Sequence, residues 1–225
     1  FDPGRAAYQV AWEADDTLDA LVAAGVLDPV LLVGVDNSPA RMTEYTPSVD
    51  PDEGLGGGAA DYARFLVEEL KPWVDATLRT LPDRDDTGVL GSSLGGLVSL
   101  YLLRQHPEVF GRVGVVSPSL WWNRQEALGW AEEIATEWTP GSRLWLDIGT
   151  AEGGDPDGDG MTGAVAQTRA LRDGLLARGL TWGEDLGYLE GEGEPHNEAA
   201  WAWRFPGMLT FLYGRRPLSP PRALL

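Results

Sequence analysis

Two kinds of segment alternate along the chain, and this alternation limits the possible folds more than any other feature of the sequence. Short apolar runs rich in Val, Leu and Ile are separated by longer stretches in which apolar residues recur three and four positions apart. The short runs are typical of buried strands, and the longer stretches are typical of amphipathic helices. Alternation of this kind predicts an α/β fold with a mostly parallel central sheet and helices on both faces.

The predicted strands lie at residues 29–35, 87–90, 112–116, 143–148 and, with a weaker pattern, 182–189. The predicted helices lie at residues 12–24, 61–78, 94–105, 125–136, 164–178 and 199–213. Pro72 is expected to kink or restart its helix because proline has no backbone N–H. Residues 217–225 are expected to form a loose tail. A length of 225 residues without repeats or a linker predicts a single domain over 1–225.

The charge balance and the lack of cysteine exclude several classes of function. The formal net charge is -18, whereas nucleic-acid binding depends on clustered Lys and Arg. We therefore expect neither nucleic acid nor a membrane as a partner, and no apolar run approaches the roughly 20 residues that cross a bilayer. Without cysteine there is no thiol nucleophile and no thiolate metal site, and the compartment stays open between cytoplasm and exterior.

The strongest chemical motif is Gly91-Ser92-Ser93-Leu94-Gly95, which stands where an apolar run ends and an apolar helical stretch begins. It matches G-x-S-x-G, the nucleophile elbow, in which a sharp strand-to-helix turn exposes a serine. Small residues are needed there because neighbouring chain passes close by. We predict Ser93 as the nucleophile and the backbone N–H of Leu94 as an oxyanion donor. The alternative is an ordinary Gly/Ser-rich turn.

A serine nucleophile needs a general base, and the sequence offers only His106 and His196. His106 ends the helix that starts beside Ser93, about 15 to 20 Å away at 1.5 Å per residue, so it is interpreted as a helix-end or surface residue. His196 lies in a glycine-rich loop between the last predicted strand and the final helix. His196 is therefore the predicted base, and the alternative is an exposed loop histidine without a catalytic task.

The predicted acid follows the strand at 143–148, because the chain order of an α/β-hydrolase triad is Ser, then Asp or Glu, then His. Glu152 is the first acidic residue after that strand and is the predicted acid. Asp155 is the second choice, since it lies further out in Gly-rich sequence. Glu152 is preferred because position is best determined close to the strand end.

The segment Asp155-Pro156-Asp157-Gly158-Asp159-Gly160 resembles the first half of a calcium-binding loop. The twelfth position of such a loop would be Ala166, which cannot supply the closing bidentate carboxylate. We interpret the segment as a solvated loop, with a hard cation as the alternative. No metal and no cofactor is expected in the function.

Tryptophans are numerous, and several fall near the ends of elements that should border the site: Trp121, Trp122, Trp201 and Trp203. Aromatic walls suit an aryl or acyl group. Trp121 is the best candidate for a substrate-binding residue. The alternative for each is packing in the core.

Together, several short motifs make the chain resemble the Putative esterase family of α/β hydrolases, which includes siderophore, feruloyl and acetyl-xylan esterases and S-formylglutathione hydrolases. The motifs are Val35-Asp36-Asn37, Arg41, Glu44-Tyr45-Thr46-Pro47, the elbow Gly91 to Gly96, Phe110-Gly111, Ser117 to Trp122, Gly149 to Glu152, and Pro195-His196-Asn197. The resemblance covers nearly the whole chain and implies that Ser93 and His196 act as nucleophile and base. Some relatives lack a clear acid, which makes Glu152 less firmly implied.

The chain departs from this family at its start. Relatives have a strand and a His-Asp-Gly type loop before the segment equivalent to Phe1-Asp2-Pro3, and that loop supplies a second oxyanion donor. The strand would lie in the middle of the sheet, between the runs at 29–35 and 87–90. We therefore expect N-terminal strands that this sequence does not contain.

The predicted function is a serine-dependent carboxylic ester hydrolase that works through an acyl-enzyme on a small or aryl/acyl ester. The alternatives are an acyltransferase with the same nucleophile and a non-catalytic binding domain. The expected partner is a small-molecule ester, whose identity the sequence does not determine because fold does not specify substrate.

Overall fold

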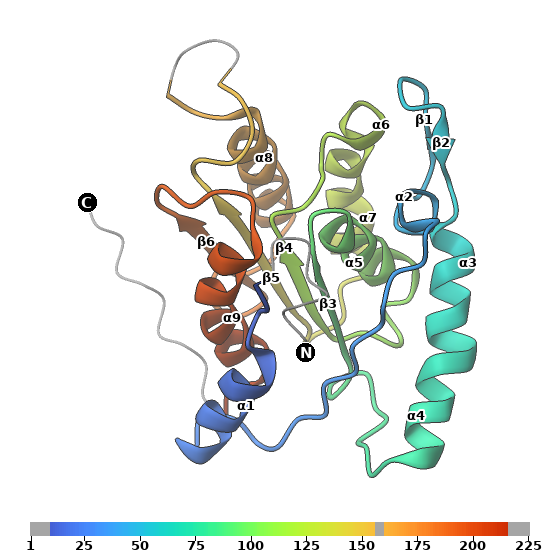
Figure 1. The fold of residues 1–225 in the computed structure, drawn as a ribbon, viewed down its shortest axis with the longest axis vertical. Coiled ribbons are helices and arrows are strands. Elements are labelled where there is room, and N and C mark those ends of the chain that lie inside the picture. The colour runs from blue at the N-terminus through green and yellow to red at the C-terminus, as the bar shows by residue number, and fades with distance from the viewer. Residues whose placement is uncertain (1–9, 156–159, 216–225) are drawn as a thin grey trace.

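The computed structural model describes residues 10–155 and 160–215, and its centre is a parallel sheet (Figure 1). The sheet has the order β3-β4-β5-β6, with β3 at Gly88–Ser92, β4 at Arg112–Val116, β5 at Arg143–Gly149 and β6 at Leu186–Gly191. All three pairings in it are parallel. The predicted α/β class is therefore confirmed. A separate antiparallel pair joins β1 (Val49–Asp50) to β2 (Leu55–Gly56).

The helical elements in chain order are α1 (Ala14–Ala23), α2 (Arg41–Glu44), α3 (Ala59–Arg64), the π-helical η2 (Phe65–Leu70), α4 (Lys71–Thr77), α5 (Leu94–Gln105), α6 (Trp122–Gln125), the 3-10 helix η3 (Glu126–Trp130), α7 (Ala131–Thr136), α8 (Gly163–Ala177) and α9 (Glu198–Tyr213). Among the described residues, no helix is both long and apolar enough to cross a bilayer. The predicted tail at 217–225 lies outside the described residues.

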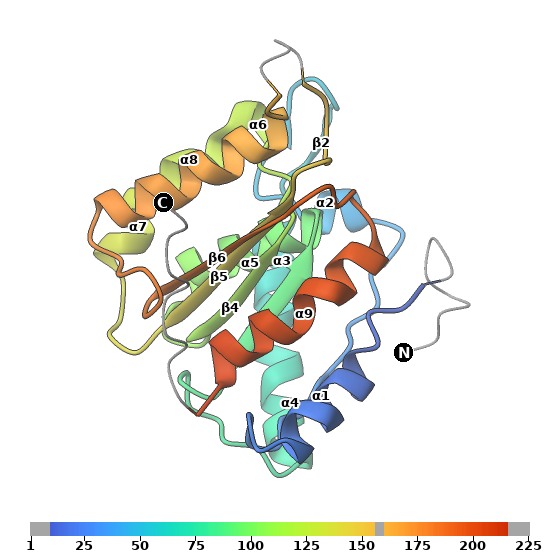
Figure 2. The ribbon, with the colours of Figure 1, turned by 90° about the vertical axis from the view of Figure 1, so that its left-hand side faces the viewer.

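The helices cover both faces of the sheet, and Figure 2 shows α1 and α9 on one side with α7 and α8 on the other. In strand β5, successive residues are buried on opposite faces of the sheet. Leu144 and Leu146 are fully buried with the α5, α7 and α8 residues of the larger core, whereas Trp145 packs with α9 on the opposite side. Successive strand residues point to opposite faces, so a run that is apolar at every position buries both sides.

The predicted strand at 29–35 is wrong. Its side chains do alternate, since Leu31 and Val33 are exposed while Val30 and Leu32 pack against the α1 and α9 core. In the described part of the chain, however, no strand pairs with this segment, and β3 is the end strand of its sheet. A run with strand periodicity does not form a strand without a neighbour to complete its hydrogen bonds.

Two other predicted elements are corrected in their extent. The last strand runs from Leu186 to Gly191, and Trp182 contributes only an isolated bridge to Leu186. The helix predicted at 125–136 consists of η3 followed by α7, and it is separated from α6 by the positive φ angles of Asn123, Arg124 and Gln125. The helix predicted at 61–78 does restart, as expected, where α4 begins beside Pro72.

The sheet brings the ends of its strands, and therefore the loops that follow them, to one edge. Ser92 is level with Val116, Val116 with Asp147, and Gly149 with Gly191. Carboxyl ends of parallel strands meet at the same edge, which is where open α/β sheets place their sites. All the predicted site residues lie just beyond this edge in sequence.

Candidate active site

Ser93 occupies a strained turn between β3 and α5. Its φ and ψ are 60° and -123°, outside the region that residues with a side chain normally adopt. The turn is held by the Ser93 N–H, which donates to Val116 O at 3.0 Å, and by the Ser93 carbonyl, which accepts from Leu97 N at 3.1 Å. The start of α5 therefore directs its unpaired first N–H groups, that of Leu94 among them, toward the space beside Ser93.

Close packing explains the first glycine of the motif. A Cβ added at Gly91 would lie 2.7 Å from the carbonyl carbon of Gly95, and one at Gly96 would lie 2.9 Å from Val116 O. Neither backbone can move easily. At Gly95 itself a Cβ would meet nothing within 4 Å. The motif's two glycines are thus required to different degrees by this fold.

The hydroxyl of Ser93 is paired with Ser119, which follows β4. The two Oγ atoms lie 3.3 Å apart, and the Ser119 N–H donates to Ser93 O at 3.1 Å. In the part of the chain that the structure describes, no hydrogen bond joins Ser93 to His196. Catalytic hydrogen bonds are often long or absent without substrate, and a serine hydroxyl changes partner by rotation about χ1.

Glu152 and His196 are in direct contact. Glu152 Oε2 lies 2.6 Å from His196 Nδ1, and the carboxylate is buried with a residue exposure of 2%. Its other oxygen, Oε1, accepts from Ser117 Oγ at 2.5 Å and from Gly149 N at 2.8 Å. Burial favours the neutral acid, but the bonds from His196, Ser117 and Gly149 outweigh it and hold the pKa of Glu152 below its usual value.

The structure separates the first choice of acid from the second. Asp155 is exposed, and its Oδ2 accepts from Gly160 N at 3.0 Å within its own loop. His106 caps the far end of α5 and has its Nδ1 3.2 Å from Glu108 Oε1. The geometry thus brings together Glu152 and His196, and leaves Asp155 and His106 outside the group. Asp157 and Asp159 of the calcium-loop hypothesis lie outside the described residues.

A buried ionic group that the sequence analysis missed lies directly behind Glu152. Arg204 of α9 is 2% exposed and Asp147 of β5 is fully buried, with 3.1 Å between Arg204 Nε and Asp147 Oδ1. Burial raises the pKa of Asp147 to about 6, although Arg204, Trp145 and Ser117 act in the opposite direction. A charged residue inside an apolar strand, and another inside an apolar helix, were the signals available in the sequence.

The candidate tryptophans differ in how deeply they are buried. Trp121 is 46% exposed and packs with its ring centroid 5.5 Å from that of Trp122, which is completely buried. Trp201 is buried and meets the His196 ring edge to face at 4.9 Å, so it supports the histidine from behind. Trp203 is 75% exposed.

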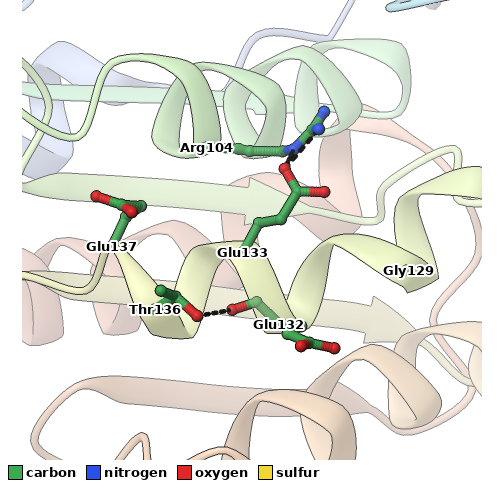
Figure 3. A pocket seen from close by; sticks show the side chains of 6 residues that line it. All are labelled: Arg104, Gly129, Glu132, Glu133, Thr136 and Glu137. Atoms are coloured by element: carbon green, nitrogen blue, oxygen red, sulfur yellow. Dashed lines mark hydrogen bonds and ion pairs between the residues drawn. The ribbon is translucent and has the colours of Figure 1, made fainter.

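Two hollows stand out on the described surface. One of about 310 Å³ is lined by Val10, His196, Asn197, Glu198 and Ala199, beside the candidate base. The other, of about 360 Å³, lies on α5 and α7 at the end remote from Ser93 (Figure 3). There Arg104 is paired with Glu133, and the remaining lining residues are Gly129, Glu132, Thr136 and Glu137. Only the first hollow adjoins the group described above.

A parallel sheet with a serine elbow after β3 and a histidine loop after β6 is the arrangement of the α/β-hydrolase fold. Solved structures bear this out: the BES protein from Bacillus cereus matches with a TM-score of 0.71 and 23% identity, over 89% of this chain and 76% of that one. The siderophore hydrolase EstA from Aspergillus nidulans matches with a TM-score of 0.64 and 23% identity, over 88% and 78%. At this identity the likeness shows the fold.

The family follows from the sequence comparison. The model of the family described as "Putative esterase" matches residues 4–212, so the chain belongs to that family. The YbbA protein of Bacillus subtilis is 27% identical over 84% of this chain and 75% of its own length. The iron(III) salmochelin esterase of Escherichia coli is 31% identical over 60% of this chain, a match that spans 34% of that protein. These findings support ester hydrolysis.

Proposed function

We propose that the protein is a serine esterase in which Ser93 is the nucleophile, His196 the general base and Glu152 the residue that orients the histidine. The contact of 2.6 Å between Glu152 Oε2 and His196 Nδ1 carries this proposal. A carboxylate at Nδ1 keeps the proton on that nitrogen and leaves Nε2 free to accept the serine proton. The strained conformation of Ser93 at the start of α5 supports it independently.

The proposed reaction has two acyl-transfer steps. The Ser93 hydroxyl turns from Ser119 toward His196, gives its proton to Nε2, and its oxygen bonds to the ester carbonyl carbon. The oxyanion is held by the Leu94 N–H and the positive end of α5. The intermediate collapses to the acyl-serine as His196 returns the proton to the departing alcohol. Water then gives a proton to His196 and bonds to the acyl carbon, and the bond from that carbon to Ser93 Oγ breaks as His196 returns the proton to Oγ and the acid leaves.

The substrate we propose is a small or aryl ester with Trp121 as one wall of its site. The half-exposed ring of Trp121 lies two residues after Ser119, whose hydroxyl meets that of Ser93. Several relatives are siderophore or feruloyl esterases. Siderophore and feruloyl esters therefore head the substrate screen. The net charge of -18 favours neutral over strongly anionic esters at low salt.

The test of the activated serine is labelling by a fluorophosphonate probe. The wild-type protein should be labelled at one site, Ser93→Ala should not be labelled, and Ser92→Ala is the matched control that should label normally. Labelling that survives Ser93→Ala would move the nucleophile elsewhere. Absence of labelling in the wild type would favour the non-catalytic binding domain.

An acyltransferase would label in the same way, so the products distinguish the two activities. A hydrolase releases free acid at a rate that added alcohol acceptors change little. A transferase gives mainly the new ester when the acceptor is present, and that outcome would replace hydrolysis as the function.

A further inference from the structure

Arg204 makes polar contacts with Glu152 and with Glu194, a residue of the loop that carries His196. Its Nη2 donates to Ser117 Oγ at 2.8 Å and lies 3.5 Å from Glu152 Oε1. Its Nη1 is bonded to Glu194, which lies in the same loop as His196. One guanidinium thus connects the loop after β5 to the loop after β6.

The hydrogen bonds that Ser117 accepts determine that its hydroxyl donates to Glu152. The Ser117 oxygen accepts from Arg204 Nη2 and also from Trp201 Nε1 at 3.0 Å. A hydroxyl has two acceptor positions and one proton. With both acceptor positions taken, the proton of Ser117 is left for Glu152 Oε1, 2.5 Å away.

The same logic extends to the histidine. Glu152 Oε1 is occupied by the Ser117 hydroxyl and the Gly149 N–H, so Oε2 faces His196. A carboxylate oxygen only accepts, so His196 Nδ1 must carry the proton. The orientation and tautomer of the imidazole therefore follow from how Glu152 is held, and Arg204 Nη2 helps to hold Glu152 through the Ser117 hydroxyl.

The electrostatics require a cation at this place. Asp147 and Glu152 are buried, and Glu194 is largely so, with a side-chain exposure of 18%. Buried carboxylates are costly unless they are paired and hydrogen-bonded, and a planar guanidinium can pair with several at once. Lysine would supply the charge but could not reproduce the separate Nε and Nη contacts.

We propose that Arg204 is a positioning residue, which holds Glu152 and the His196 loop in the geometry that makes His196 a base. This inference rests on the proposed esterase function for its kinetic consequence, although its structural core, the His196 tautomer, does not. The alternative is that Arg204 merely anchors α9 to the sheet.

Arg143 provides the matched control, because it anchors the other end of the same helix. Its Nη1 donates to Phe211 O at 2.9 Å and Leu212 O at 3.3 Å, and it touches none of the residues around Glu152. Arg204→Met, Arg204→Lys and Arg143→Met are compared by ester hydrolysis and by NMR of the hydrogen-bonded His196 Nδ1–H proton, with thermal unfolding to verify folding.

We expect Arg204→Met to lower kcat by about 100-fold, the loss that accompanies displacement of a catalytic group by about 1 Å, with little change in KM. The downfield Nδ1–H signal should be lost with it, and Arg204→Lys should restore only part of either. Arg143→Met should keep both. If Arg204→Met does not fold, Arg204→Lys together with Ser117→Ala, which removes the intermediate hydroxyl, decides by the same two measurements.

The inference is overturned if Arg204→Met keeps wild-type kcat and the Nδ1–H signal, or if Arg143→Met loses both to the same extent. Failure of the proposed function would give different results, and these would be seen in the wild type. The wild type would then show neither hydrolysis nor fluorophosphonate labelling, and the Nδ1–H signal alone would still report whether Arg204 positions His196.

Discussion

Glu152 Oε2 and His196 Nδ1 lie 2.6 Å apart although 44 positions separate the two residues in the chain. Adjacent parallel strands bring them together, since Gly149 at the end of β5 is level with Gly191 at the end of β6. The Thr150 N–H donates to Gly191 O at 2.9 Å and the Ala151 N–H to Glu194 O at 3.2 Å, so the two loops continue the pairing of the strands. The contact is thus built on backbone hydrogen bonds, which favours a well-defined geometry.

Replacement of either proposed catalytic residue should almost abolish ester hydrolysis. Ser93→Ala and His196→Ala are each expected to lower kcat by several powers of ten, and the double variant should be little worse than either, because triad members act as a unit. Steady-state kinetics on a neutral aryl ester provide the measurement, and His106→Ala is the control. A loss of about tenfold or less in both single variants would refute the assignment.

Glu152→Gln should cost far more activity than Asp155→Asn. The amide at position 152 could present an N–H to His196 Nδ1 and so favour the wrong tautomer, which costs up to about 10⁴-fold in kcat in a working triad. Asp155 is exposed and its Oδ2 accepts from Gly160 N within its own loop, whereas Glu152 is the carboxylate bonded to His196 Nδ1. Parallel kcat measurements on the two variants test this, and equal activities would indicate that the enzyme works as a Ser-His pair.

Asp147 should make stability fall as pH rises through its titration. Its pKa in the folded state is about 6, raised by burial from the ordinary 3.8, so the folded protein binds more protons than the unfolded chain between those values. Stability contributed by the neutral form is therefore present at low pH and lost as pH rises from about 4 to about 6.

Asp147→Asn removes that titration. The difference in unfolding free energy between variant and wild type should shift in favour of the variant by on the order of 3 kcal/mol between pH about 4 and about 7. Urea unfolding at several pH values measures this difference. Loss of the contacts to Arg204 and Trp145 changes the unfolding free energy of the variant by a similar amount at every pH, so the test is how the difference changes with pH. A parallel pair of stability curves would contradict the raised pKa.

The two glycines of the elbow motif should differ in their tolerance of alanine. Gly91→Ala places a Cβ 2.7 Å from the Gly95 carbonyl carbon, where backbone must move, and should destabilise by about 1 to 3 kcal/mol. Gly95→Ala meets nothing within 4 Å and lies in the first turn of α5, so it should be neutral or stabilising by up to about 1 kcal/mol. The denaturant midpoints of the two variants measure this difference. Equal losses of stability would contradict the prediction that a Cβ fits at Gly95.

Much of the fold could be predicted because it is encoded locally. The strands at β3, β4 and β5 follow from short apolar runs, and the elbow follows from five consecutive residues. The sequence predicts Glu152 as the acid because it stands nearest to a strand end, where hydrogen bonding in the sheet restricts the backbone. The segment at 29–35 shows the limit of this reasoning, because periodicity states which side chains would face inward but not whether a partner strand is present.

By itself, therefore, the sequence determined the alternation of strands and helices, the serine turn and the loop that carries His196. Only the tertiary structure decided that Glu152 meets His196, and that Arg204 and Ser117 lie behind them. Arg204 and Ser117 are 87 positions apart, and nothing in the pattern near either one indicates the other. Secondary structure depends on near neighbours along the chain, whereas the pairing of buried charges depends on which strand ends the folded sheet places side by side.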